Sequence, residues 1–185
     1  DDENYGLVGN IYRGRVVNVL PGMQAAFVDI GLERNAFLYV VDINTENSVF
    51  DYNDKDNKDQ TNIKSLSIND IIREGQEITV QILKEPMGTK GARVTTNITL
   101  PGRYVVLMPT LNYVGVSRRI ETEEERQRLK QIAEAIKPED IGLIVRTAAR
   151  DKNEEDLIPD IEMLCRLWEK IKEDEKAGIA PRILH

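Results

Sequence analysis

The sequence predicts an α+β protein with two domains: a five-stranded β-barrel over residues 7–100 and a smaller mixed α+β domain over residues 101–176. The first domain is indicated by five short segments rich in β-branched residues, separated by Gly-, Pro- and Asn-containing turns. The second is indicated by short strand patterns that alternate with two amphipathic helical patterns. A chain of 185 residues is long enough for each domain to bury a core of its own.

Three strands with their turns begin the barrel. Residues 10–20 are rich in β-branched side chains, and the turn dipeptide Pro21-Gly22 follows them. Residues 24–30 form the second predicted strand, and a turn at 31–35 leads into the third at 36–40. Short turns of this kind favour an antiparallel meander.

The next stretch, residues 44–70, is heavy in Asp, Asn, Lys and Ser, which is typical of a long polar loop. Strand character returns at 77–84, where apolar and polar residues alternate. A Gly-rich hairpin at 88–91 then leads into a fifth strand at 93–100. Five strands with a long connection between the third and fourth match an OB-fold barrel, whose second and third strands commonly bind oligonucleotides.

A boundary is expected at Pro101-Gly102. The elements expected after it are strands at 103–108, 113–117 and 142–147 and helices at about 122–137 and 154–176. The first helix begins with a capping box, in which Thr122 and Glu125 each satisfy a free backbone N–H of the other. This order of elements favours a small α+β domain over a second barrel.

The meander predicts a candidate surface for single-stranded nucleic acid. Its exposed face would present Phe27 and Phe37 from two neighbouring strands, beside Arg13 and Arg15. Every base has a face that can stack on a ring, and every nucleotide link carries a phosphate for a cation. Tyr12 and Arg13 are further candidates on this face. The alternative is that the rings fill the barrel core.

Charge is unevenly distributed along the chain. The formal net charge is −7, which argues against nucleic-acid binding, but residues 86–120 and 141–150 contain seven Lys and Arg residues and no Asp or Glu. Such basic stretches in an acidic protein predict one attractive surface with little non-specific binding. Lys90, in the Gly-rich hairpin, is either a phosphate contact or a solvated loop lysine. An acidic scaffold that binds a protein partner is the alternative reading of the whole chain.

A single cysteine, Cys165, excludes an internal disulfide and a multi-cysteine zinc site within this chain. Its apolar helical neighbours favour a buried thiol over a reactive one. No secretory leader pattern and no apolar run of membrane-spanning length occurs, so the expected compartment is the cytoplasm.

Five blocks of sequence resemble the N-terminal half of the bacterial ribonuclease E/G family. They are Asn10-Ile-Tyr-Arg-Gly-Arg, Ala25-Ala-Phe-Val-Asp-Ile-Gly, Gly102-Arg-Tyr-Val-Val-Leu-Met-Pro, Val116-Ser-Arg-Arg-Ile and Gly142-Leu-Ile-Val-Arg-Thr-Ala. The first block is shared with RNA-binding barrels of the ribosomal protein S-one type. The later blocks resemble the 5′-sensor domain of the family, and the whole resemblance covers residues 7–175 in order.

The resemblance implies roles for particular residues. The positions that match the family's pocket for an RNA 5′-monophosphate are Gly102, Val106, Arg146 and Thr147. At this pocket the guanidinium fork of Arg146 would engage phosphate oxygens, and the main-chain N–H of Val106 would donate a hydrogen bond. The positions that match RNA contacts on the barrel are Phe27, Phe37 and Lys90.

The resemblance also implies what lies elsewhere. In the family, a downstream domain cleaves single-stranded RNA with paired aspartates and magnesium. The sequence of that domain, with its paired aspartates, is absent here. The chain is therefore expected to bind RNA with a 5′-monophosphate without cutting it and to need no cofactor of its own. The rest of the ribonuclease chain is the expected partner, with self-association in the full-length enzyme. Two alternatives remain: hydrolysis at an unrecognised metal site, and single-stranded nucleic-acid binding without 5′-end discrimination.

Overall fold

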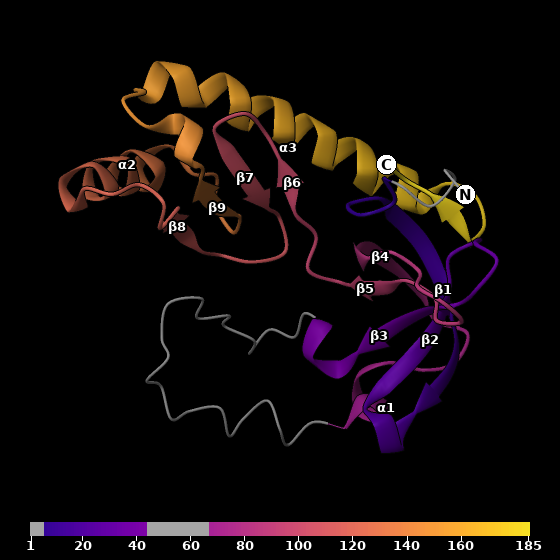
Figure 1. The fold of residues 1–185 in the computed structure, drawn as a ribbon. Coiled ribbons are helices and arrows are strands. Elements are labelled where there is room, and N and C mark those ends of the chain that lie inside the picture. Colours follow the sequence, from indigo (N-terminus) through magenta and orange to yellow (C-terminus); the bar gives the residue numbers. More distant parts are fainter. Residues whose placement is uncertain (1–5, 44–66) are drawn as a thin grey trace. The chain divides into compact units, whose positions relative to one another are not determined.

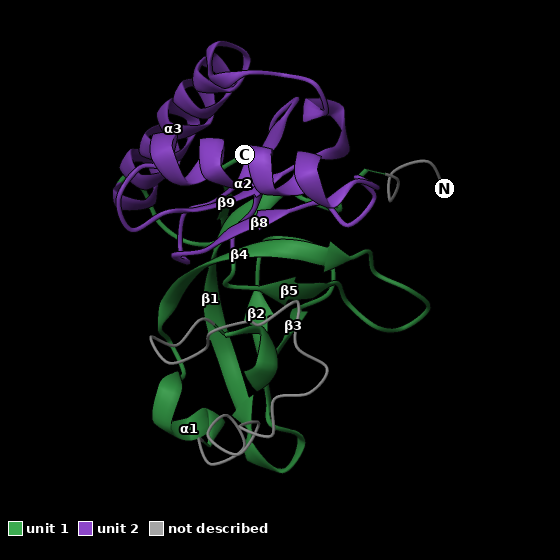
Figure 2. Cartoon of the chain, turned by 90° about the vertical axis from the view of Figure 1, so that its left-hand side faces the viewer, with its two compact units in different colours: residues 1–97, 177–185 green, residues 98–176 purple. Residues whose placement is uncertain are grey.

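A computed structural model describes residues 6–43 and 67–185, and it divides into two compact units (Figure 2). One unit comprises the described residues of Asp1–Asn97 together with Ala177–His185, and the other comprises Ile98–Lys176. Most of the polar loop predicted at residues 44–70 lies outside the described residues. The short helix α1 (Ile68–Ile71) follows it.

Within the described part of the first unit, five strands close into a mixed barrel (Figure 1). β1 (Ile11–Leu20), β2 (Ala25–Asp29) and β3 (Ala36–Tyr39) form the antiparallel meander. β4 (Glu77–Lys84) pairs antiparallel with both β1 and β5 (Arg93–Thr95), and a parallel pairing of β3 with β5 completes the ring. The predicted OB-like barrel is confirmed.

Alternating side chains fill the barrel, because successive residues of a strand point to opposite faces. β1 pairs with β4 over its first half and with β2 mainly over its second half, and its register with β2 shifts between Val16 and Asn18, which is typical of a β-bulge. Where β1 crosses β2, a Cβ on Gly14 would lie 2.7 Å from Cγ1 of Val28, so only glycine allows this approach. The core includes Val16, Ala26, Val28, Leu38, Val80, Ile82 and Val94.

The fifth predicted strand, residues 93–100, is wrong in its extent. β5 ends at Thr95, and β6 (Leu100–Pro101) belongs to the sheet of the second unit. The break occurs because Thr95 bonds locally: its hydroxyl donates to the carbonyl of Asp42 at 2.9 Å and accepts from the N–H of Asn97 at 3.0 Å. These bonds take the place of further ladder pairing.

The last residues of the chain return to the barrel, although the sequence indicated no element there. β10 (Arg182–Ile183) pairs antiparallel with Tyr12 and Arg13 of β1. The N–H of Leu184 adds a 2.8 Å hydrogen bond to the carbonyl of Ile11. The first half of β1 therefore has β10 as a neighbour in addition to β4.

In the second unit, a sheet in the order β6-β7-β9-β8 is covered on one face by two helices. β7 (Val105–Met108) and β9 (Gly142–Val145) are antiparallel, and β8 (Val114–Val116) runs parallel to β9. α2 (Glu123–Ile136) packs on β8 and β9, and α3 (Glu154–Lys176) packs on β6 and β7. The buried residues include Val105, Leu107, Leu143 and Val145 of the sheet and Leu129, Ala133, Leu157, Ile161 and Leu164 of the helices.

The capping box of α2 forms only in part. The hydroxyl of Thr122 accepts a hydrogen bond from the N–H of Glu125 at 3.4 Å, as predicted. The carboxylate of Glu125 instead accepts from the side chain of Arg128 at 3.0 Å and from the N–H of Asp151 at 3.2 Å. The charged partner draws this carboxylate away from the cap.

Candidate nucleic-acid interface

The two predicted aromatic residues lie on the outer face of the barrel. Phe27 and Phe37 are direct partners across β2 and β3, with ring centroids 4.7 Å apart and planes inclined by 49°. Both rings are half-buried, whereas their neighbours Ala26 and Leu38 are fully buried. The alternation of the meander therefore places the rings at the surface, and the core alternative is wrong.

The register extends this pair into a row across all five strands of the barrel. Phe27 pairs with Asn18 on one side, and Phe37 pairs with Arg93 on the other, next to Lys84. We call Asn18, Phe27, Phe37, Arg93 and Lys84 the cross-strand row. It combines two rings with two cations, which is the composition that a single-stranded nucleic acid requires.

Arg93 is held in place from two directions. Its Nε and Nη2 donate to the carboxylate of Asp42 at 2.9 and 3.3 Å, and its guanidinium lies 5.1 Å from the ring centroid of Tyr39. The hydrogen bonds to Asp42 raise the pKa of Arg93 above its ordinary value. Tyr39, two residues after Phe37 on the same strand, thus adds a third ring to the outer face.

The sequence interpretation missed Asn18, Tyr39, Lys84 and Arg93. Tyr39 could have been found, because it follows Phe37 at the strand period of two. Arg93 could not, because its place beside Phe37 depends on the parallel pairing that closes the barrel.

Lys90 is exposed in the hairpin between β4 and β5, where Met87 and Lys90 form a bridge. Two contacts hold this hairpin against the turn before β3. Arg34 donates a hydrogen bond to the carbonyl of Gly88, and Gly91 lies so close to Asn35 that a Cβ would be 2.0 Å from its carbonyl oxygen. These contacts fix the hairpin that carries the exposed Lys90.

The expected positions of Tyr12 and Arg13 need correction. Tyr12 is only 4% exposed and belongs to the barrel core, so it does not lie on the outer face. Arg13 points outward, but its guanidinium donates to Thr79 of β4 at 3.1 Å. It lies five residues before Asn18, the row member on β1, which is roughly 16 Å along the strand.

Arg15 is similarly engaged near the start of β1. Its guanidinium forms an ion pair with Glu77 of β4 at 3.0 Å. The sequence had placed Arg15 beside the rings, but in the structure the cation next to Phe37 is Arg93.

In the second unit, the end of β9 brings Arg146 and Gly102 together. The Arg146 N–H donates to the carbonyl of Tyr104 at 2.7 Å, and its Nη1 donates to the carbonyl of Gly102 at 2.6 Å. Thr147 follows in a 3-10 turn, Thr147–Ala149, with its hydroxyl 3.0 Å from that of Ser117. Arg146 itself is exposed and retains further N–H groups for a ligand.

Val106 lies on the same strand as Tyr104, but its main chain is in the middle of the sheet. It is paired with Pro101 of β6 and with Ile144 of β9. A strand with neighbours on both sides directs its N–H groups into the ladder. The expectation that the Val106 N–H serves a ligand is therefore not supported, and its half-buried side chain is the part that a ligand could reach.

Further cations surround Tyr104 near this site. The guanidinium of Arg103 lies 5.0 Å from the ring centroid of Tyr104, and the ammonium of Lys152 lies 5.9 Å from it. Cations over a ring are attracted by its negative face. Together with Arg146 they make this part of the unit attractive to an anion.

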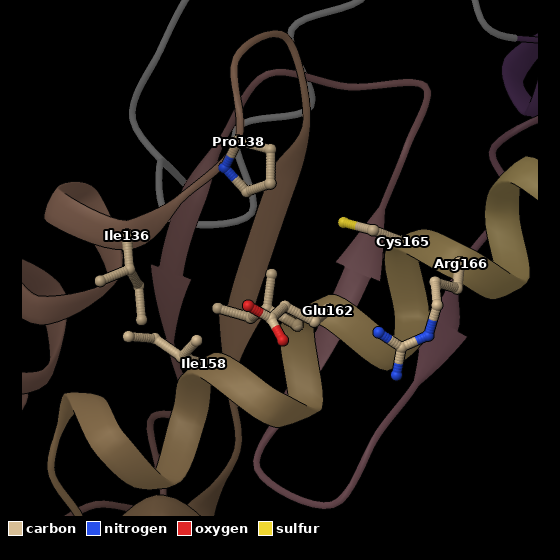
Figure 3. A pocket seen from close by; sticks show the side chains of 7 residues that line it. Ile136, Pro138, Ile158, Glu162, Cys165 and Arg166 are labelled. Carbon is tan, nitrogen blue, oxygen red and sulfur yellow. The ribbon is translucent and has the colours of Figure 1, made fainter.

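A separate apolar cavity of about 510 Å³ lies beside α3 (Figure 3). Its lining consists of Ile136, Pro138, Ile158, Ile161, Glu162, Cys165 and Arg166. Burial raises the pKa of the Cys165 thiol, and the nearby carboxylates of Glu169 and Glu162 act in the same direction. Cys165 is half-buried rather than fully buried as predicted, but a raised pKa leaves less of the thiolate, which is the nucleophile.

Two absences apply to residues 6–43 and 67–185. No helix there has both the length and the apolar character that a membrane span needs. No group of three or more His, Cys, Asp or Glu side chains there is placed to hold a metal ion.

Comparisons with known proteins agree on one family. Residues 99–185 match the model of the ribonuclease E/G family. Ribonuclease G of Haemophilus influenzae is 55% identical over 91% of this chain, and ribonuclease G of Escherichia coli strain K12 is 48% identical over 92%. Ribonuclease E of Nostoc sp. strain PCC 7120 is 45% identical over 96% of the chain.

The chain spans 33–34% of the length of these two ribonuclease G proteins and 24% of the ribonuclease E. The relatives match more than nine-tenths of the chain, and so extend the similarity from the second unit into the barrel. With the predicted sequence blocks and the OB-like barrel, these matches show that the chain belongs to the ribonuclease E/G family.

Proposed function

We propose that this chain is the substrate-binding part of a ribonuclease: the cross-strand row of the barrel holds single-stranded RNA, and the second unit recognises a 5′-monophosphate at Gly102, Arg146 and Thr147. The observation that carries the RNA-binding proposal is the register-paired Phe27 and Phe37 with Arg93 beside them. The similarity of the chain to proteins named ribonuclease G and ribonuclease E also supports the proposal.

The 5′-end proposal rests on the chemistry of Arg146. A guanidinium offers five N–H donors in a fork that fits two phosphate oxygens, and the carbonyl of Gly102 engages only Nη1. The Thr147 hydroxyl next to Ser117 can supply another hydrogen bond. A triphosphate would add bulk and charge, so discrimination would come from the shape of the site as well as from attraction.

The test compares one short RNA carrying a 5′-monophosphate, a 5′-triphosphate or a 5′-hydroxyl, with binding followed by fluorescence anisotropy. We expect the monophosphate RNA to bind best and Arg146→Ala to abolish the difference. Arg166→Ala is the matched control, since it removes an exposed arginine from α3 of the same unit. Equal affinity for all three ends would leave an RNA-binding protein without 5′-end recognition.

A second measurement separates RNA binding from a protein-binding scaffold and from hydrolysis. Affinity for RNA should fall steeply with salt, because each neutralised phosphate releases counterions. Labelled RNA incubated with the chain and magnesium should remain intact. Salt-independent binding would favour the scaffold, and cleavage would show a catalytic site in this chain.

A further inference from the structure

A buried carboxylate, that of Asp160, is hydrogen-bonded to the backbone next to the proposed phosphate site. Asp160 of α3 is only 8% exposed and lies among the N–H groups of three consecutive residues. Oδ1 accepts from Arg103 at 3.0 Å, and Oδ2 accepts from Tyr104 at 2.8 Å and from Val105 at 3.1 Å. These three bonds hold one backbone segment to the helix.

The segment that Asp160 holds is the one that orients Arg146. We call residues 102–105 the 102–105 turn, which is closed by a 2.7 Å hydrogen bond from the Gly102 N–H to the carbonyl of Val105. The carbonyls of Gly102 and Tyr104 accept from the guanidinium and the backbone N–H of Arg146, respectively. A continuous chain of hydrogen bonds thus runs from Asp160 through the turn to Arg146.

The fit between the carboxylate and the turn is close. A Cβ on Gly102 would lie 2.6 Å from both carboxylate oxygens of Asp160, so any other residue would push the carboxylate away. Glycine at this position is therefore explained by Asp160. Without the carboxylate, three N–H groups, of which that of Val105 is buried, would lose their acceptor and the turn would rearrange.

We infer that Asp160 is a positioning residue for 5′-phosphate recognition: it does not touch the phosphate, but it fixes the 102–105 turn whose carbonyls aim Arg146. The inference rests on the proposed function of that site. The three N–H groups that donate to Asp160 partly offset its negative charge, which reduces its repulsion of a phosphate at this site.

The test is Asp160→Asn, which keeps the shape but leaves one oxygen for three donors. The preference for 5′-monophosphate over 5′-hydroxyl RNA should fall roughly tenfold. This magnitude is taken by analogy from metal sites, where removing a group that orients a ligand typically costs tenfold or more in affinity. Affinity for 5′-hydroxyl RNA should not change. The matched control is Asp156→Asn, one turn earlier on α3, whose carboxylate accepts the N–H of the nearby Asn153 at 2.9 Å.

A second variant addresses the mechanism. Asp160→Ala should lose the same preference, and added formate should restore it by refilling the space between the three N–H groups. Formate should not restore it in Asp160→Asn, where the amide occupies that space. A general loss of structure would not be reversed by a small carboxylate, so rescue of the alanine variant alone supports the positioning role.

A third measurement needs no variant. Hydrogen exchange at the amides of Arg103, Tyr104 and Val105 should slow when the wild-type chain binds 5′-monophosphate RNA but not 5′-hydroxyl RNA. Unchanged exchange, or a folded Asp160→Asn variant with the wild-type preference, would overturn the inference. If the wild-type chain itself shows no preference, the proposed 5′-end recognition fails instead.

Discussion

Replacing Phe27 by alanine is the most direct test of the cross-strand row. Its ring is half-buried on the outer face and lies 4.7 Å from that of Phe37. The substitution removes one ring on which a base could stack, and it also removes a packing contact that holds the ring of Phe37 in place. It should therefore weaken RNA binding while leaving the barrel core unchanged.

The magnitude follows from these contacts. Stacking of a base on a ring is worth about 1–3 kcal/mol, which corresponds to a loss of affinity of about 5- to 150-fold. The ring pair contributes about 0.5–1.5 kcal/mol to stability beyond the burial of apolar area, and because Phe27 is half-buried the total cost of its truncation should stay below the 3–5 kcal/mol typical of a core phenylalanine. The Phe27→Ala variant should thus stay folded. Because the two rings touch, Phe27→Ala and Phe37→Ala together should lose less affinity than the sum of the single losses.

The assay is fluorescence anisotropy with a 5′-hydroxyl RNA, so that recognition of a 5′-phosphate does not enter. Ile183→Ala is the matched control, since it removes an exposed apolar side chain from β10 of the same unit. The ratio of wild-type to Phe27→Ala affinity should be the same at low and high salt, because stacking releases no counterions. Wild-type affinity in a folded Phe27→Ala variant would refute RNA stacking on this ring.

Four further outcomes are expected. Lys84→Ala should lower the salt slope of RNA affinity by about 0.7, the value for one phosphate contact to a single strand, and an unchanged slope would remove this lysine from the interface. Gly91→Ala should lower the free energy of unfolding in urea by about 1–3 kcal/mol, because its Cβ would overlap a backbone carbonyl, whereas Gly22→Ala, with open space around it, should change it little. Asp42→Ala should lower the free energy of unfolding in urea by about 1–2 kcal/mol, because it breaks the paired hydrogen bonds to Arg93, whose side chain is 35% exposed. An unchanged free energy of unfolding would mean that this ion pair contributes nothing to stability. Cys165 should react with iodoacetamide only slowly at neutral pH, because a raised pKa leaves less thiolate at any given pH. The pH at which its reaction rate reaches half its maximum should lie above that of a free thiol in the same buffer.

Local patterns were enough to predict most of the strands and to place Phe27 and Phe37 on neighbouring strands, but they left open whether the rings lie outside the barrel or in its core. Phe27 and Phe37 each alternate with small or apolar residues, and short turns leave little freedom in how their strands pair. Tyr12 shows the limit of this reasoning. Tyr12 was expected on the same face as Arg13, but successive residues of a strand point to opposite faces, so Tyr12 lies inside with Val16 while Arg13 points outward.

The sequence by itself determined the family resemblance, most of the succession of elements and the placement of two phenylalanines on neighbouring strands. Turns, helix caps and alternation depend on residues close together in the chain. The tertiary structure decided which groups meet across long separations. The parallel closure of β3 on β5 places Arg93 beside Phe37. The packing of α3 places Asp160 among the N–H groups of residues that precede it by 55 or more positions. Such contacts depend on register and packing, which no local pattern encodes.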